Sequence, residues 1–194
     1  LRAMIQIQLK KQIRDHFLKR RNSLTAKAVS DFSKQINENI ESQDLFKSSL
    51  NIGTYISIKN EPSIERKRDK IYSCPKIIGK EIDFFKIQKN FNKGIFGIPE
   101  PTPSIPVDIF KLDIILIPLV AFNKKLERIG YGKGFYDKFL ARFNNAIKRP
   151  HFWGIAYDFQ IVEEIFGDKL DIKLDKVITE TNIYAVSYTH LTLP

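Results

Sequence analysis

The sequence predicts an α/β fold: a single three-layer α/β/α domain on a mostly parallel or mixed central sheet, in the Rossmann-like manner. Short apolar, β-rich segments alternate along the chain with segments of helical periodicity. The run at residues 112–120 (LDIILIPLV) is almost continuously apolar, which is typical of a strand buried on both faces of a sheet. A glycine-rich segment then separates this run from a further helical pattern, as in many strand-loop-helix units.

The first half of the chain carries two helical patterns followed by strand patterns. Residues 7–20 place Leu9, Ile13 and Phe17 on one face, which predicts an amphipathic helix. Ser23 or Thr25 is positioned to cap a second helix that continues to residue 40. We expect strands at 50–58, 70–75 and 82–87, a short charged helix at 65–70, and a proline-stiffened loop at 97–101.

The second half begins with the buried strand at 112–120, which a polar connection at 121–126 should follow. Phe135, Phe139 and Phe143 recur at helical spacing, so we expect a helix from about residue 134 to residue 147. A strand at 152–156, a short helix at 160–165 and a last strand at 176–179 complete the prediction.

Length and composition limit the class of protein. A chain of 194 residues can bury a real core, and no repeat or linker suggests a division, so we expect one domain at residues 4–184. Residues 1–3 precede Met4, and residues 185–194 (AVSYTHLTLP) change in character; we expect both to be non-native extensions. The single cysteine, Cys74, excludes an intrachain disulfide and is expected in the core. With no apolar run of membrane-spanning length, the predicted location is cytoplasmic, with no membrane partner.

The net charge of +10 and the pI near 9.6 raise the question of nucleic-acid binding. The cations, however, are spread along the chain and mixed with acids, as in residues 65–70 (ERKRDK). A solvated surface accounts for most of the excess charge, and an anionic substrate would account for the rest. We therefore expect no nucleic-acid partner.

The segment 128–137 (RIGYGKGFYD) has the composition of an anion-binding loop. Its three glycines allow positive φ angles and let backbone N–H groups approach a ligand. The first turn of the following helix adds unpaired N–H donors, and Arg128 and Lys133 add full charges. The spacing matches neither the Walker pattern nor the dinucleotide fingerprint. Phosphate is the expected ligand, because a plain tight turn explains one glycine better than three glycines with two cations.

A second polar segment, Lys59-Asn60-Glu61, follows another predicted strand. Ligands of open α/β sheets bind at the carboxyl ends of the strands. The glycine-rich segment and residues 59–61 are therefore expected to face one cleft.

Several motifs occur in the order found in one known family. They are residues 10–14 (KKQIR), 97–101 (GIPEP), 128–140 (RIGYGKGFYDKFL), 159–160 (FQ), 171–175 (DIKLD) and 177–180 (VITE). As an ordered set, from about Lys10 to Glu180, they resemble 5-formyltetrahydrofolate cyclo-ligase, also called methenyltetrahydrofolate synthetase. The resemblance implies an ATP-dependent, Mg²⁺-requiring conversion of 5-formyltetrahydrofolate to 5,10-methenyltetrahydrofolate. The formyl oxygen would be phosphorylated, N10 would attack, and ADP and phosphate would be released.

Such chemistry requires alignment of two ligands and neutralisation of charge rather than a nucleophilic triad. The sequence offers no convincing Ser-His-Asp or Cys-His set. The resemblance therefore agrees with the residue types present.

The resemblance also implies roles for individual residues. The catalytic residues would be Lys133, Arg128 and Tyr136, with Lys133 stabilising charge on the transferring phosphoryl group. ATP would be bound by Lys10, Arg14, Arg128, Gly130, Gly132, Gly134, Phe135 and Tyr136. The folate would be bound by Ile56, Glu61, Phe96, Glu100, Tyr131, Gly132, Lys133, Gly134 and Phe135. Asp137 and Asp171 match the family's Mg²⁺ positions, and carboxylates suit that ion.

Several of these residues also have an ordinary structural interpretation. Lys10 and Arg14 could form a solvated stripe, Asp137 could be a first-turn acid, and Glu61 could be an exposed acid before a proline. A basic nucleic-acid-binding module and another small-molecule kinase or nucleotide-binding enzyme of the same fold remain alternatives. Our leading interpretation is a monomeric enzyme whose folate substrate includes polyglutamylated forms.

Overall fold

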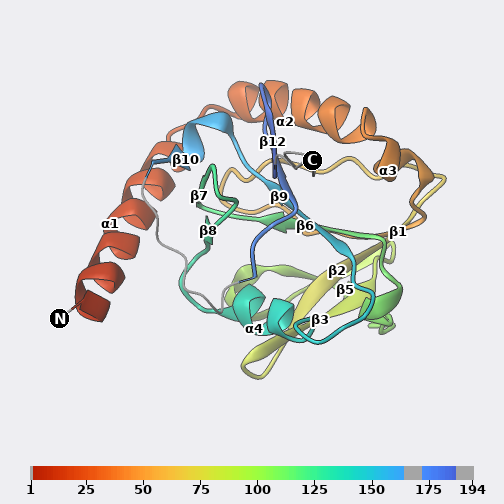
Figure 1. Cartoon of the computed structure of the whole chain (residues 1–194). Helices are drawn as coiled ribbons and strands as arrows, with labels where there is room; N and C mark the ends of the chain where they lie inside the picture. The colour runs from red at the N-terminus through yellow and green to blue at the C-terminus, as the bar shows by residue number, and fades with distance from the viewer. Residues whose placement is uncertain (1, 164–171, 187–194) are drawn as a thin grey trace, which may run out of the picture.

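A seven-stranded mixed sheet forms the centre of the computed structural model, which describes residues 2–163 and 172–186 (Figure 1). The strand order is β12-β11-β9-β6-β1-β2-β3. The strands are β1 (Asn51–Gly53), β2 (Ile71–Ile78), β3 (Glu81–Lys86), β6 (Ile114–Pro118), β9 (His151–Ile155), β11 (Lys176–Ile178) and β12 (Ile183–Ala185). From β2 to β11 all neighbours are parallel, whereas β3 and β12 are antiparallel at the two edges. The predicted fold class is confirmed.

Helices cover both faces of this sheet. Figure 1 shows α2 (Ala26–Glu41) above it and α4 (Phe135–Ala141) below it. Strand β6 lies between the two helical layers. Its residues Ile114 and Leu116 pack in one apolar cluster with Ile36 and Ile40 of α2. Its residues Ile115 and Ile117 face the other side and belong to a second cluster with Phe139 of α4. Residues 114–117 are completely buried, as predicted for a strand covered on both faces.

The longest helix, α1 (Arg2–Asn22), lies against a small second sheet. This sheet consists of β7 (Ala121–Asn123), β8 (Arg128–Ile129) and β10 (Ile161–Val162), in the order β10-β7-β8. Ile13 and Phe17 of α1 pack on Ala121 and Ile129, which places the helix beside the glycine-rich segment that follows β8. The chain also forms α3 (Asp44–Ser48), a hairpin of β4 (Asn90–Lys93) and β5 (Pro99–Thr102), and the 3₁₀ turns η1 (Ile95–Gly97), η2 (Ile109–Lys111) and η3 (Asp158–Gln160).

Several predicted elements were wrong in type or extent. The strand expected at 50–58 is limited to three residues, because the chain leaves the sheet after Gly53. The polar connection at 121–126 contains β7, and the loop at 97–101 contains most of β5. The helix expected to reach residue 147 ends at Ala141, and the short helix expected at 160–165 is replaced by the end of η3 and by β10 up to residue 162. Strand β12 was not predicted and includes Ala185, one residue beyond the expected end of the domain.

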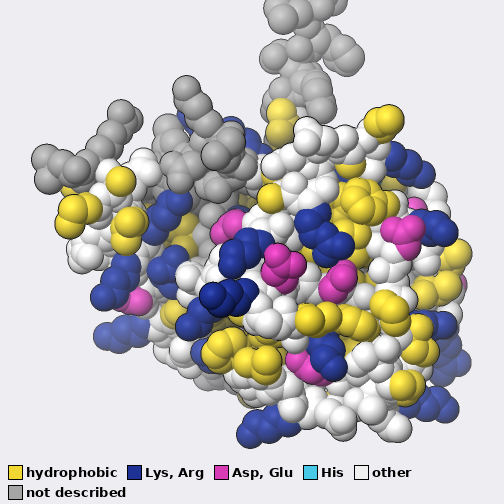
Figure 2. Space-filling model, turned by 90° about the horizontal axis from the view of Figure 1, so that it is seen from below, with side chains coloured by type: hydrophobic (Ala, Val, Ile, Leu, Met, Phe, Trp, Pro, Cys, Tyr) yellow, Lys and Arg dark blue, Asp and Glu magenta, His cyan; other side chains and the backbone are white. Residues whose placement is uncertain are grey.

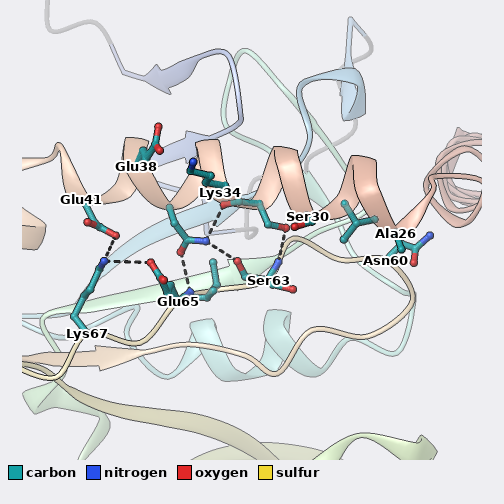
Figure 3. A pocket seen from close by; sticks show the side chains of 13 residues that line it. Ala26, Ser30, Lys34, Glu38, Glu41, Asn60, Ser63, Glu65 and Lys67 are labelled. Atoms are coloured by element: carbon teal, nitrogen blue, oxygen red, sulfur yellow. Dashed lines mark hydrogen bonds and ion pairs between the residues drawn. The ribbon is translucent and has the colours of Figure 1, made fainter.

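Residues 65–70, which were expected to form a charged helix, do not: residues 65–67 run along α2 without regular secondary structure, and residues 68 and 69 lie in a turn (Figure 3). Asn37 Nδ2 donates to the backbone oxygens of Ser33 and Ser63, both at 2.8 Å, and Asn37 Oδ1 accepts from the backbone N–H of Glu65 at 2.9 Å. Ser33 Oγ accepts from the Ser63 N–H at 2.9 Å. These bonds satisfy backbone groups that a local helix would otherwise pair, and they leave an open hollow of about 890 Å³ between α2 and residues 60–67.

We expect Asn37→Ala to lower the free energy of unfolding by about 2 kcal/mol, because it leaves backbone groups of the 63–65 segment without partners. Urea denaturation would measure the change. The control is Gln35→Ala on the same helix, whose exposed amide contacts only Glu38 and which should change stability by less than about 0.5 kcal/mol. Equal effects of the two substitutions would contradict the role given to Asn37.

Cys74 is buried in the core, as expected, and its side chain has no exposed surface. The Trp153 side chain in β9 is likewise completely buried. Burial raises the pKa of the Cys74 thiol to about 12, which keeps it in the unreactive thiol form. Across residues 2–163 and 172–186, no helix combines the length and apolar character needed to span a membrane.

Candidate active site

A pocket of about 540 Å³ lies where α1, the loop after β1, the β4–β5 hairpin and the glycine-rich segment meet. Pro118 at the end of β6 and Tyr55 shortly after β1 contribute to its walls, so it opens at the carboxyl ends of parallel strands, as expected. The structure brings into this one pocket all the predicted site residues that it describes: Lys10, Arg14, Ile56, Glu61, Phe96, Glu100, Arg128, Gly130, Tyr131, Gly132, Lys133, Gly134, Phe135, Tyr136 and Asp137. The remaining one, Asp171, lies outside the described residues.

The glycine-rich loop is docked against α1 through Arg14. Arg14 Nε donates to the backbone oxygen of Gly130 at 2.8 Å. The guanidinium group then covers Gly132, where an added Cβ would lie 3.1 Å from Arg14 Cζ. Gly132 has a φ of +90° and Gly134, the N-cap of α4, has a φ of +70°, a left-handed backbone that favours glycine at both positions. The loop therefore combines a left-handed backbone with a cation held at its surface.

Arg128 and Asp137 form an ion pair at the wall of the pocket. Arg128 Nη1 and Nη2 donate to the same oxygen, Asp137 Oδ1, at 2.9 and 2.8 Å. The Arg128 side chain is 7% exposed, whereas that of Asp137 is 59% exposed. Oδ2 of Asp137 receives no bond from this arginine. The described residues contain no group of three or more His, Cys, Asp or Glu side chains placed to hold a metal ion.

Aromatic rings and a lysine lie at the mouth of the pocket. Lys133 Nζ is 5.3 Å from the centroid of the Phe96 ring, and the Phe96 and Phe135 rings are 6.4 Å apart. Phe96 is 64% exposed and has a φ of 59° at the tip of the β4–β5 hairpin. Within the described part of the chain Lys133 forms no ion pair, so its charge is free to meet an anion.

Glu61 lies at the floor of the pocket and is only 3% exposed, so the alternative interpretation as an exposed acid was wrong. Its Oε2 accepts from the backbone N–H of Ile58 at 2.9 Å, and its Oε1 accepts from the Tyr131 hydroxyl at 2.8 Å. Burial raises the pKa of the Glu61 carboxyl, and the positive charge of Arg21 opposes that rise. A buried carboxyl with two further lone-pair directions can accept hydrogen bonds from a polar heterocycle.

Sequence reasoning missed Arg21, which is completely buried behind this floor. It donates to the backbone oxygens of Lys59 and Leu119 at 3.1 and 3.3 Å and to the Tyr131 hydroxyl. The spacing contained a signal, because Arg21 follows Arg14 by seven residues and so lies on the same face of the helix. The basic run at residues 19–21 concealed that signal, since such runs ordinarily end helices in solvent.

The Tyr136 hydroxyl is a buried polar group with no hydrogen-bond partner among the described residues. Burial raises its pKa, so the hydroxyl stays protonated and can donate. Because Tyr136 lines the pocket, a ligand can satisfy this group.

The burial of Glu61 predicts a pH-dependent contribution to stability. Its pKa in the folded protein is raised above the ordinary value of 4.5, so the folded state binds the proton more tightly than the unfolded chain does. This contribution is fully present below pH 4.5 and is lost as the pH rises through the raised pKa. We expect the wild type to lose stability relative to Glu61→Gln, which cannot titrate, between acidic and neutral pH. Urea denaturation of both proteins at matched pH values would measure this. A difference in the free energy of unfolding that does not change with pH would contradict the prediction.

Charged groups of both signs are mixed on one face of the molecule. Figure 2 shows lysine and arginine side chains interspersed with acidic and apolar ones on the face seen from below. On this face the cations do not form a single continuous patch.

Comparison with known proteins identifies the family to which the chain belongs. Residues 6–180 match the model of the 5-formyltetrahydrofolate cyclo-ligase family. The chain is 32% identical to the 5-formyltetrahydrofolate cyclo-ligase of Mycoplasma genitalium over 87% of this chain and 96% of that protein. It is 30% identical to the Mycoplasma pneumoniae enzyme of the same name over 88% of this chain and 98% of that protein.

Solved structures give the same result. The NMR structure of Aquifex aeolicus 5,10-methenyltetrahydrofolate synthetase matches with a TM-score of 0.78 at 29% identity, covering 95% of this chain and all of that one. The 5,10-methenyltetrahydrofolate synthetase of Mycoplasma pneumoniae matches with a TM-score of 0.71 at 28% identity, covering 88% of this chain and 98% of that one. The predicted resemblance and enzyme class are confirmed, and the family is ATP-dependent. The chain belongs to the 5-formyltetrahydrofolate cyclo-ligase family and is a ligase of folate metabolism that forms 5,10-methenyltetrahydrofolate.

Proposed function

We propose that the 540 Å³ pocket holds the triphosphate of ATP and the formyl group of 5-formyltetrahydrofolate side by side, with the glycine-rich loop between them. The observation that carries this proposal is the convergence of separate motifs on one pocket. Cations from α1, a left-handed glycine loop and a buried carboxyl from the loop after β1 all line it. The pocket thus offers donors for a polyanion on one side and apolar walls with a polar floor on the other.

The phosphate side consists of Lys10 and Arg14 together with the loop itself. Lys10 and Arg14 are four residues apart, which places both cations on one face of α1. The backbone N–H groups at the start of α4 add donors and the positive end of a helix dipole. In this arrangement Lys133 neutralises charge on the phosphoryl group as it transfers.

Asp137 is the proposed Mg²⁺ ligand, since Mg²⁺ is commonly bound by one or two carboxylates plus substrate phosphates. Its exposure and the Oδ2 atom that Arg128 leaves uncontacted fit that role. When bound, the ion would neutralise phosphate charge and orient the terminal phosphoryl group. Asp171 remains a second proposed ligand.

The folate side consists of the Glu61 carboxyl and apolar walls that include Ile56, Phe96 and Phe135. Glu61 accepts hydrogen bonds from the pterin, while the rings cover its flat faces. Glu100, paired with Lys76 at 3.4 Å on the hairpin, lines the same side. This mixture of flat apolar walls and a few polar groups is typical of sites for heterocyclic ligands.

The residues then act by alignment and electrostatics. The formyl oxygen attacks the terminal phosphorus and ADP leaves. N10 next attacks the activated formyl carbon and loses its proton, and phosphate leaves with the former formyl oxygen, taking up that proton as hydrogen phosphate. Lys133 and Arg14 stabilise the negative charge that moves between the oxygens, and the Tyr136 hydroxyl can donate to one of them. A second function, nucleic-acid binding, has less support because Arg14 and Arg128 are held within the pocket walls.

The test is a spectroscopic assay of the methenyl product, whose ring closure extends conjugation and changes its near-ultraviolet absorbance. We expect the absorbance of a mixture with 5-formyltetrahydrofolate to rise only when both ATP and Mg²⁺ are present, with one ADP formed per product. A rise without ATP would contradict the phosphorylation step, and a rise without any divalent cation would contradict the role of Asp137. Location in the cytoplasm, the monomeric state and binding of polyglutamylated folate remain predictions.

A further inference from the structure

A buried hydrogen-bonded network connects the last turn of α1 to the floor of the pocket. It runs from the Arg21 guanidinium to the Tyr131 hydroxyl and on to Glu61 Oε1. Tyr131 belongs to the glycine-rich loop, whereas Glu61 belongs to the loop after β1, so the two sides of the pocket meet through one hydroxyl. Arg21 is completely buried and Glu61 is 3% exposed, which shields their charges from solvent.

The same arginine also holds the backbone around Glu61. It donates to the Lys59 oxygen, and in return the Asn60 side chain donates to the backbone oxygens of Arg21 and Leu24 at 3.1 Å. Lys59 and Asn60 have φ angles of 47° and 58°, which ordinary residues adopt rarely. Reciprocal bonds between this turn and the end of α1 thus stabilise a left-handed pair of residues immediately before Glu61.

Helix α1 therefore holds the glycine-rich loop at two consecutive residues. Arg14 binds the Gly130 oxygen and Arg21 binds the Tyr131 hydroxyl, from the same face of the helix. The two arginines serve different sides of the pocket. Arg14 lies among the groups assigned to phosphate, and Arg21 lies behind the groups assigned to folate.

We propose that Arg21 is a positioning residue for the folate substrate, acting through Tyr131 to hold the Glu61 carboxylate in place. This inference rests on the proposed placement of folate beside Glu61. The planar guanidinium of Arg21 donates to the Lys59 oxygen, the Leu119 oxygen and the Tyr131 hydroxyl together. The side chain of lysine is shorter and ends in a single nitrogen, so it cannot reach all three acceptors at once.

The decisive variant is Arg21→Lys, which keeps the positive charge but cannot form all three hydrogen bonds of the guanidinium group. We expect about a 100-fold loss of kcat/KM for 5-formyltetrahydrofolate, the size that a displacement of about 1 Å produces, with the KM for ATP changed less than about twofold. The matched control is Arg20→Lys, the same substitution at the neighbouring exposed residue, where the cation stacks on Phe159 outside the pocket. That control should leave both KM values as in the wild type.

A second variant guards against a loss of folding in Arg21→Lys. Tyr131→Phe keeps the ring and removes only the hydroxyl that joins Arg21 to Glu61. Tyr131→Phe should reproduce the loss of kcat/KM for 5-formyltetrahydrofolate. In the double variant, kcat/KM should fall by much less than the product of the two single-variant losses, because both substitutions act through one network. A folate kcat/KM like that of the wild type in Tyr131→Phe would overturn the proposal even if Arg21→Lys does not fold.

Two further results separate the possible failures. Equal changes in the KM values for ATP and folate, or a lowered melting temperature with unchanged kinetics, would show that Arg21 is only structural. Glu61→Gln tests the placement on which the inference rests: an unchanged folate KM in that variant would overturn the proposed folate site itself. If Glu61→Gln raises the folate KM while Arg21→Lys and Tyr131→Phe do not, the folate site stands and only the positioning role fails.

Discussion

Lys133→Ala is expected to abolish nearly all turnover while leaving the fold intact. The side chain is exposed at the mouth of the pocket, where its ammonium group lies 5.3 Å from the Phe96 ring. In the proposed mechanism this ammonium group, together with Arg14, stabilises charge on the transferring phosphoryl group, and its removal leaves that charge only partly neutralised. Removal of one such electrostatic contact lowers kcat by about 100- to 1,000-fold. Steady-state assay of the methenyl product, together with the melting temperature, would measure both parts of the prediction.

The matched control for this prediction is Lys138→Ala. Lys138 lies five residues further along, in α4, and contacts only the Lys80 backbone oxygen, at 3.4 Å. It carries the same charge and the same exposed position but does not line the pocket. Comparable losses in the two variants would point to the general positive potential of this surface, and wild-type turnover in Lys133→Ala would remove its catalytic role.

Gly132→Ala is expected to have the second largest effect, through the shape of the loop. A Cβ at this position would lie 3.1 Å from Arg14 Cζ, and the φ of +90° is strained for any residue with a side chain. Relief of the contact would move the Arg14 guanidinium away from the Gly130 oxygen, which it binds at 2.8 Å. We expect kcat/KM for ATP to fall about 100-fold, because the phosphate-binding groups are misplaced by about 1 Å.

Gly79→Ala separates backbone strain from the effect on the site. Gly79 has a φ of +62° in the turn between β2 and β3, where an added Cβ would meet no neighbouring atom within 4 Å. Both substitutions should reduce stability by roughly 1 kcal/mol through the left-handed backbone. Only Gly132→Ala should reduce activity, as measured by product formation and urea denaturation on the same preparations. An active Gly132→Ala enzyme would show that the contact with Arg14 is dispensable.

The parts of the fold that the sequence predicted well are those with strong local patterns. Strand β6 and helix α2 each combine a long apolar pattern with clear boundaries, and Thr25 caps α2 as one of the two expected residues. The segments predicted poorly depend on distant partners. Residues 65–70 have a helical composition, yet the side chain of Asn37 holds their start against α2 without regular secondary structure. Strand β12 is recognisable only through its pairing with β11.

The candidate site shows the same division. Gly132, Lys133 and Glu61 each belong to a polar segment that follows a predicted strand, so their grouping in one pocket could be predicted, because ligands of open α/β sheets bind at the carboxyl ends of the strands. The burial of Glu61, the pairing of Arg128 with Asp137 and the role of Arg21 could not, since each depends on which segments fold against one another. The sequence by itself determined the fold class, the position of the glycine-rich loop for which we propose phosphate binding, and the family. Only the tertiary structure decided how charges are paired and buried within the pocket, because desolvation and hydrogen bonding arise from contacts between residues far apart in the chain.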